Sequence, residues 1–249
     1  MKQLENKVAI ITGAGSGIGK ATAALFAEQG AKVVVSDISE TNGLAVVAEL
    51  KKNGGDAYFV KADSSKPADN QALVEQTLEQ YGALDIAVNN AGIGGPLSST
   101  AEYSIEGWQK VIDINLSGVF YGLRYQIPAM LEKGGSIVNV ASILGQAGTK
   151  FSPAYVAAKH GVVGLTKAAA LENADKKIRI NSIGPGYIKT PLVMSSLDEP
   201  AVNALVGLHP IGRLGESEEI AELILWLASS KSSFVTGAYY PIDGGYLAQ

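Results

Sequence analysis

The sequence contains no cysteine, which excludes disulfide bonds, thiolate zinc sites and cysteine nucleophiles. Histidine is also scarce. The two histidines, His160 and His209, lie far apart along the chain and have no carboxylate at the spacing of a metal-ligand motif. We therefore expect structural roles for both histidines and no metal site.

Long apolar runs and an excess of positive charge are missing as well. No run reaches about 18 uninterrupted apolar residues, and MKQLENKVAIITG at the start holds no apolar stretch of signal-peptide length. The formal net charge is -4, and no basic stripe is available for a phosphate backbone or an anionic membrane. We expect a cytoplasmic protein that binds small molecules and neither nucleic acid nor membranes.

What is present is a regular alternation of short β-branched runs and longer amphipathic segments over 249 residues. Runs such as VAIIT and KVVVSD are largely apolar, as parallel strands covered on both faces are. The pattern predicts an α/β fold with a doubly wound parallel sheet (a Rossmann fold) of seven strands and helices on both faces. Six strands are expected at Val8–Thr12, Lys32–Asp37, Ala57–Lys61, Leu84–Asn89, Ile137–Ala141 and Ile178–Ile183.

No break in composition divides the chain, so residues 1–249 are expected to form a single domain. Residues 187–215 are irregular. Their apolar side chains, which include Leu192, Met194, Leu197 and Leu205, follow a Thr190–Pro191 break without the alternation of a strand. Because long irregular segments in compact domains are usually functional, this segment predicts a lid over a substrate.

A glycine-rich turn, TGAGSGIG at residues 12–19, follows the first strand and precedes a good helix. Gly13 permits the tight turn, Gly17 allows the backbone to approach a pyrophosphate, and Gly19 allows close packing of helix and strand. The spacing is G-x-x-x-G-x-G and differs from the dinucleotide-binding G-x-G-x-x-G. By itself the turn leaves a merely tight connection open as an alternative.

Five further motifs follow along the chain: NNAG at Asn89–Gly92, Asn115 in DINLSG, Ser142 after IVNVA, YVAAK with Tyr155 and Lys159, and PGYIKTP with Thr190. Together with the glycine spacing, their order resembles the short-chain dehydrogenase/reductase family over nearly the whole chain. The resemblance implies an oxidoreductase of the carbonyl reductase or alcohol dehydrogenase type. Ala158 departs from the pattern, because many members carry serine before the lysine.

The resemblance also indicates the cofactor. Asp37 ends the second strand, where a carboxylate accepts hydrogen bonds from the adenosine ribose and repels a 2′-phosphate. Ser16 and Ile38 stand where NADP-dependent relatives carry arginine or lysine, so we expect NAD(H). The alternative is that Asp37 only ends a strand and caps a turn.

The cofactor contacts implied in this way are Gly13, Ser16, Gly17, Ile18, Gly19, Asp37, Ile38, Ala62, Asp63, Ser64, Asn89, Ala91, Gly92, Tyr155, Lys159, Pro185, Gly186, Ile188 and Thr190. Asn89 and Asn90 also have a structural alternative, since asparagines fix turns by bonding backbone groups.

Tyr155 and Lys159 are four residues apart in a predicted helix and therefore share one face. A nearby ammonium stabilises a phenolate and brings the pKa of a tyrosine closer to neutrality. By resemblance, Tyr155 exchanges a proton with the substrate oxygen, and Ser142 hydrogen-bonds that oxygen. Lys159 binds the nicotinamide ribose and adjusts Tyr155, while Asn115, bent out of its helix, holds a water that passes the proton onward.

The predicted substrate pocket is formed by Gly94, Ser142, Leu144, Gln146, Tyr187, Met194 and Leu205. It is mostly apolar, which favours a neutral ketone or secondary alcohol. A 3-oxoacyl-carrier-protein reductase, a sugar or polyol dehydrogenase, and a dinucleotide sensor without catalysis remain alternatives.

Apolar helix faces at 111–130 and 155–172 imply, by the same resemblance, a homotetramer. The C-terminal FVTGAYYPIDGGYLAQ is too apolar for a free tail and is expected to lie against a neighbouring subunit.

Overall fold

The computed structural model describes residues 2–195 and 198–249, so Leu197 of the predicted lid lies outside the described residues. Seven strands form one parallel sheet in the order β3-β2-β1-β4-β5-β6-β7. They are β1 (Val8–Thr12), β2 (Lys32–Asp37), β3 (Asp56–Lys61), β4 (Ile86–Asn89), β5 (Gly135–Val140), β6 (Ile178–Pro185) and β7 (Tyr239–Ile242). The predicted doubly wound fold is confirmed, with its reversal of strand order between β1 and β4.

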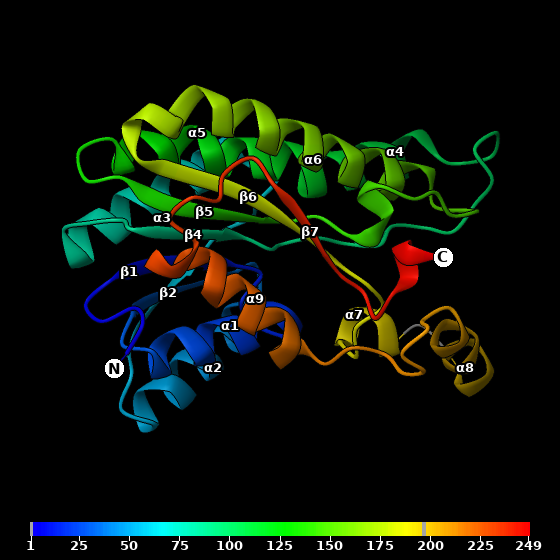
Figure 1. Ribbon diagram of the computed structural model, residues 1–249, viewed down its shortest axis with the longest axis horizontal. Coiled ribbons are helices and arrows are strands. Elements are labelled where there is room, and N and C mark those ends of the chain that lie inside the picture. Colours follow the sequence, from blue (N-terminus) through cyan, green and yellow to red (C-terminus); the bar gives the residue numbers. More distant parts are fainter. Residues whose placement is uncertain (1, 196–197) are drawn as a thin grey trace.

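Helices cover both faces of the sheet (Figure 1). One layer consists of α1 (Gly17–Glu28), α2 (Glu40–Lys52) and α9 (Ser217–Ala228). The other consists of α3 (Pro67–Tyr81), α4 (Ile105–Ile112), α5 (Gly118–Met130) and α6 (Pro153–Asn173). Short helical turns lie at Asp113–Ser117, Ile143–Gly145, Ala174–Lys176, Ser230–Ser232 and Tyr246–Ala248.

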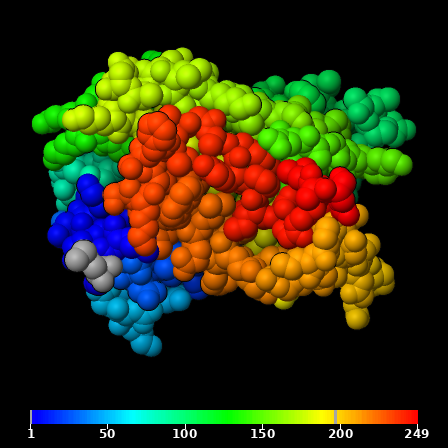
Figure 2. All heavy atoms as spheres, in the orientation of Figure 1, coloured from blue at the N-terminus to red at the C-terminus, as the bar shows by residue number. Residues whose placement is uncertain are grey.

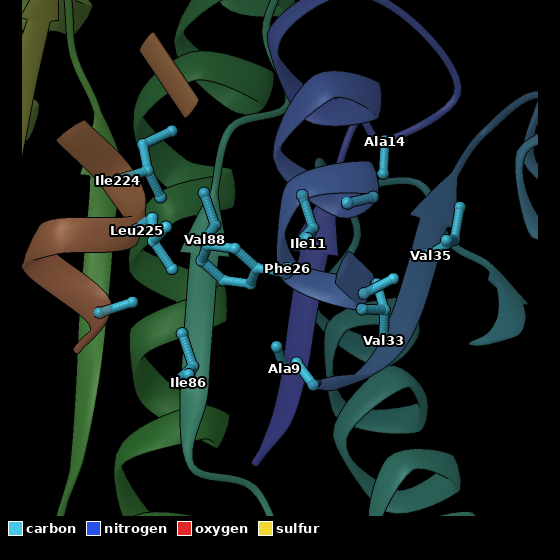
Figure 3. Packing of buried hydrophobic residues seen from close by; sticks show 14 of the residues in the cluster. Ala9, Ile11, Ala14, Phe26, Val33, Val35, Ile86, Val88, Ile224 and Leu225 are labelled. Atoms are coloured by element: carbon cyan, nitrogen blue, oxygen red, sulfur yellow. The ribbon is translucent and has the colours of Figure 1, made fainter. Parts of the chain in front are cut away.

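Each helical layer has its own apolar core, because successive strand residues point to opposite faces. Ile11 and Val88 pack with Phe26 of α1 in one core (Figure 3). Their neighbours Ile10 and Ala87 belong to the core beneath α3, α5 and α6. Burial on both faces explains why these strands are apolar almost throughout.

The seventh strand lies within the C-terminal segment that was expected to pack against a neighbouring subunit. Tyr240 packs edge-on against Trp226 of α9, with ring centroids 5.7 Å apart. The final residues lie on the surface of their own chain beside the lid segment (Figure 2). All of residues 234–249 are partly or fully exposed in the single chain, Phe234 fully so, and the expected contact of this segment with a neighbouring subunit stays a prediction.

Residues 187–215, here called the lid segment, contain α7 (Pro191–Met194) and α8 (Glu199–Gly207). The segment begins and ends at one place, because Ile188 and Gly215 form a parallel β-bridge. An ion pair between Lys189 and Glu216 adjoins this bridge. The lid segment is thus a long loop closed at its base.

Among the residues that the structure describes, no helix is long and apolar enough to cross a membrane. No group of three histidine, aspartate or glutamate side chains in this part of the chain is arranged to hold a metal ion.

Candidate active site

The glycine turn leads directly into α1, whose first residue is Gly17. Ser16 precedes the helix in extended conformation, and its side chain caps none of the first-turn N–H groups, which include that of Ile18. Gly13 and Gly17 have φ angles of +62° and +51°, and a Cβ at Gly19 would lie 2.3 Å from the Gly13 carbonyl oxygen. The turn therefore offers uncapped backbone donors at a positive helix end, which fits a pyrophosphate.

The second asparagine of NNAG fixes this turn against the end of β4. Asn90 Nδ2 donates to the carbonyl oxygens of Thr12 (2.9 Å) and Gly13 (3.1 Å). Thr12 Oγ1 accepts from the backbone N–H groups of Asn90 and Ala91. The structural role expected for Asn90 is present, and Thr12 is a partner that the sequence reasoning missed.

Asn89 faces the interior of the protein. Its Nδ2 donates to Gln126 Oε1 (3.1 Å) and Asn139 Oδ1 (2.9 Å), and its Oδ1 accepts from Gln126 Nε2 (2.8 Å). Both side-chain N–H groups are thus used on α5 and β5. The structural role considered for Asn89 is present, and its contact with the cofactor stays a prediction.

Asp37 holds two backbone segments together. Its Oδ2 accepts from Gly15 N in the glycine turn, and its Oδ1 accepts from Ser39 N before α2, each at 2.8 Å. The capping role considered as an alternative is therefore real. A carboxylate has about four lone-pair positions, so two remain for ribose hydroxyls.

A groove with a volume of about 570 Å³ runs from Ile38 and Asp63 along one side of α4. Its lining includes the carboxylates of Asp63, Glu106 and Asp113 and one ammonium, Lys110. Acidic charge therefore predominates. No sequence pattern predicts that α4 forms a wall here, because β3 and α4 are far apart along the chain.

Asp63 follows β3 at the end of this groove, between the buried Ala62 and the partly buried Ser64. Its Oδ1 accepts from the backbone N–H and the hydroxyl of Ser65. Partial burial acts to raise the pKa of Asp63, but the bonds from Ser65 and the charge of Lys66 outweigh it and lower the pKa. The carboxyl group therefore stays ionised near neutral pH.

Three of the predicted catalytic residues meet where β5 ends and α6 begins. Ser142 directly precedes a helical turn, and its Oγ accepts from Leu144 N (3.2 Å). The Ser142 hydroxyl also lies close enough to the phenol of Tyr155 to lower its pKa. Lys159 Nζ lies 5.5 Å from the centre of the Tyr155 ring and donates to the carbonyl oxygen of Val140 (2.8 Å).

Burial is the largest cause of the pKa shifts of Lys159 and Tyr155. It lowers the pKa of Lys159 to about 8. It also raises the pKa of Tyr155, assisted by Tyr187 and opposed by the Ser142 hydroxyl. Lys159 Nζ lies over the Tyr155 ring, and the expected lowering of the Tyr155 pKa by Lys159 stays a prediction.

Asn115 lies in a π-helical turn, Asp113–Ser117, so the expected bend in the helix is present. Its Oδ1 accepts from Ile93 N (2.9 Å), and its Nδ2 donates to Ile93 O (2.8 Å). A Cβ at Gly92 would lie 2.6 Å from Asn115 Oδ1 and 3.8 Å from Lys159 Nζ, which brings these three residues together. The side-chain amide of Asn115 thus fixes the Ile93 backbone, and its expected role in holding a water stays a prediction.

The loop that follows Pro185, at the end of β6, meets the glycine turn. A Cβ at Gly17 would lie 3.1 Å from Thr190 Cγ2, and Gly186 N donates to Ile242 O (3.0 Å). The buried Ile188 lies between Gly186 and Thr190 along the chain, at the β-bridge that closes the lid segment. The two predicted cofactor-binding loops are therefore neighbours.

The predicted pocket residues differ in what they can offer a substrate. Leu144 is buried, and its expected role as a pocket wall stays a prediction. Gln146 and Met194 are exposed, whereas Gly94, Tyr187 and Leu205 are partly buried. Tyr187 lies close enough to Tyr155 to affect its pKa.

The chain was compared with known proteins. Residues 13–247 match the sequence profile of a family described as enoyl-(acyl carrier protein) reductase. Over 248 residues the chain is 55% identical to cyclohexanol dehydrogenase of Acinetobacter sp. (strain SE19), covering 99% of this chain and 97% of that protein. It is 43% identical to cis-4-hydroxycyclohexanecarboxylate dehydrogenase of Sinomonas cyclohexanicum, covering 97% of each.

A solved structure of levodione reductase is similar with a TM-score of 0.94 and 40% identity, covering 98% of this chain and 99% of that chain. The chain belongs to the short-chain dehydrogenase/reductase family. This short-chain dehydrogenase is an oxidoreductase that acts on CH–OH donors with a nicotinamide dinucleotide. The uncapped N-terminus of α1 and the glycine turn fit the pyrophosphate of that cofactor.

Proposed function

We propose that this short-chain dehydrogenase interconverts an uncharged cyclic secondary alcohol and its ketone with NAD(H). The neighbouring hydroxyl groups of Ser142 and Tyr155 at the end of β5 carry the proposal, because both can reach one substrate oxygen. The cyclic substrate is suggested by the names of the two similar dehydrogenases.

In the proposed mechanism the bound cofactor supplies or accepts the hydride. Tyr155 donates its phenolic proton to the carbonyl oxygen during reduction and removes a proton from the alcohol during oxidation. Ser142 donates a hydrogen bond to the same oxygen and stabilises the negative charge that develops there.

Lys159 and Asn115 complete the proposed machinery. Lys159 Nζ has donors beyond the one used on Val140, and these would bind the nicotinamide ribose. The main chain of Asn115 would hold a water that returns the proton to solvent. Burial places the pKa of Lys159 near 8, so its charge changes close to working pH.

The preference for NAD over NADP rests on charge. Asp37 keeps two lone-pair positions for ribose hydroxyls, and a 2′-phosphate there would meet its negative charge. The neighbouring groove adds Asp63, Glu106 and Asp113 against Lys110 alone. Both features disfavour the additional phosphate of NADP.

The test is the initial rate of cyclohexanol oxidation with NAD and, separately, with NADP. We expect a clear rate with NAD and a rate at least ~100-fold lower with NADP. Tyr155→Phe should abolish turnover while its NADH affinity stays within about twofold of wild type. A preference for NADP would contradict the role of Asp37, and a fast Tyr155→Phe enzyme would contradict the catalytic assignment.

We further propose a homotetramer formed by one domain of residues 1–249 with residues 187–215 as its lid. Ile105 of α4, Phe120 of α5 and Leu171 of α6 are exposed by 78%, 46% and 84%, and such apolar surface is usual at subunit interfaces. Light scattering should give four times the 25.8 kDa chain mass, and a monomer would contradict the proposal.

A further inference from the structure

Three aromatic side chains from distant parts of the chain meet beside the proposed active site. The ring of His209 lies 5.7 Å from that of Tyr187 and 5.8 Å from that of Tyr246, and the two tyrosine rings are 6.2 Å apart. Tyr187 follows β6, His209 follows α8, and Tyr246 belongs to the C-terminal segment. The cluster therefore joins the cofactor loop, the lid segment and the C-terminus.

His209 is buried, with 4% of its surface exposed, and both ring nitrogens have backbone partners. Nε2 accepts from the N–H of Tyr187 (3.1 Å), and Nδ1 donates to the carbonyl oxygen of Leu205 in α8 (2.8 Å). A donor on one side and an acceptor on the other are satisfied together only by a neutral imidazole with its hydrogen on Nδ1. The surroundings thus select one protonation state and one tautomer.

The backbone around His209 is shaped to admit this contact. A Cβ at Gly186 would lie 2.7 Å from His209 Nε2, so only glycine leaves room for the ring next to Tyr187. Tyr187 in turn lies near Tyr155 and raises its pKa. A short chain of contacts therefore leads from α8 through His209 to Tyr187, which lies near the proposed acid.

We propose that His209 is a positioning residue: it fixes Tyr187 as the pocket wall that faces Tyr155 and couples that wall to α8 of the lid segment. This assignment rests on the proposed function, because it makes Tyr187 a substrate contact. Loss of the Tyr187–His209 hydrogen bond should raise the KM for the alcohol and leave the affinity for NADH nearly unchanged.

The other polar groups around the His209 ring are the phenols of Tyr187 and Tyr246 and the carboxylate of Asp243, which also flanks Gly186. Asp243 accepts from Gly245 N and Leu247 N, so its carboxylate is already paired. The hydrogen bond from the Tyr187 N–H is therefore the polar contact by which His209 holds Tyr187.

Two variants test the assignment. His209→Phe keeps an aromatic ring but removes both hydrogen bonds. We expect a KM about tenfold higher, which corresponds to the loss of the one hydrogen bond that holds Tyr187. His209→Gln keeps an acceptor and a donor, so its KM should stay close to the wild-type value. His160→Phe is the matched control, since it replaces the other, exposed histidine and should keep the wild-type KM.

Hydrogen exchange gives a readout that does not depend on the substrate. The Tyr187 amide is bound by His209, whereas the Gly186 and Lys189 amides in the same peptide are bound by Ile242 and Gly215. In His209→Phe, exchange should accelerate at Tyr187 alone. Equal exchange in wild type and His209→Phe would overturn the assignment. An unchanged KM in His209→Phe, or a rise in KM with parallel losses of kcat and NADH affinity, would overturn it as well. If the wild-type enzyme is inactive but exchange at Tyr187 is accelerated in His209→Phe, only the proposed function is refuted.

Discussion

Replacing Lys159 by methionine should separate the catalytic value of its ammonium from its effect on folding. Burial lowers the pKa of Lys159 from 10.5, the value of an ordinary lysine, to about 8. At 1.36 kcal/mol for each pKa unit, keeping this group charged in the folded protein destabilises it by about 3 kcal/mol. The penalty is full at neutral pH, where Lys159 is charged in both the folded and the unfolded chain.

The penalty fades as the pH rises. Above about pH 8 the folded protein holds Lys159 uncharged while the unfolded chain still binds the proton, so stability increases with pH until about pH 10.5. By about pH 9.5 the wild type should have regained about 2 kcal/mol relative to Lys159→Met, which carries no titrating group. The variant leaves the carbonyl of Val140 without its donor, which costs about 1 to 3 kcal/mol at every pH.

We therefore expect Lys159→Met to be as stable as wild type at neutral pH, or more stable by up to about 2 kcal/mol, and less stable at about pH 9.5. Its kcat should fall at least ~100-fold. Urea unfolding at the two pH values measures the stabilities, with Lys167→Met, at an exposed lysine of the same helix, as control. A stability difference that is the same at both pH values would refute the buried-charge reasoning.

Three further changes test the cofactor site and the base of the lid segment. Gly19→Ala would bring a Cβ to 2.3 Å from the Gly13 carbonyl oxygen, so NADH titration should show at least ~10-fold weaker binding, whereas Gly148→Ala, with open space around it, should bind normally. Asp37→Ala removes the carboxylate that binds the amides of Gly15 and Ser39 and repels a 2′-phosphate, so the ratio of NAD to NADP rates should fall at least ~10-fold; an unchanged ratio would exclude Asp37 as the residue that selects NAD over NADP. Arg213→Met removes an exposed ion pair with Glu219, whose pKa is lowered to about 2 by the hydrogen bonds from that arginine and from the Glu216 backbone, so thermal unfolding should show almost no change in Tm; a clear fall in Tm would mean that the base of the lid segment supports the whole fold.

Local sequence patterns were sufficient for the architecture and for part of the site. Strands such as VAIIT are apolar on both faces, which only a sheet covered on both sides explains. Tyr155 and Lys159 share a helix face because four residues are close to one helical turn. The glycines of the turn follow from backbone conformation, which a local motif encodes directly.

Other features depend on which side chains meet across the fold. The strand pattern could not tell that the amide of Asn89 turns inward to Gln126, because that pairing joins β4 to α5. Likewise, the direction of Lys159 Nζ depends on the carbonyl of Val140.

The sequence by itself determined the order of the strands and helices, the glycine turn and the helix that carries Tyr155 and Lys159, because each is encoded within about one or two turns of local backbone. Tertiary structure alone decided that α4 forms one wall of the groove beside Asp63, that the lid segment closes on itself at Ile188 and Gly215, and that His209 reaches Tyr187. These contacts join residues far apart along the chain, and burial and hydrogen bonding between such segments leave no periodic signal in the sequence.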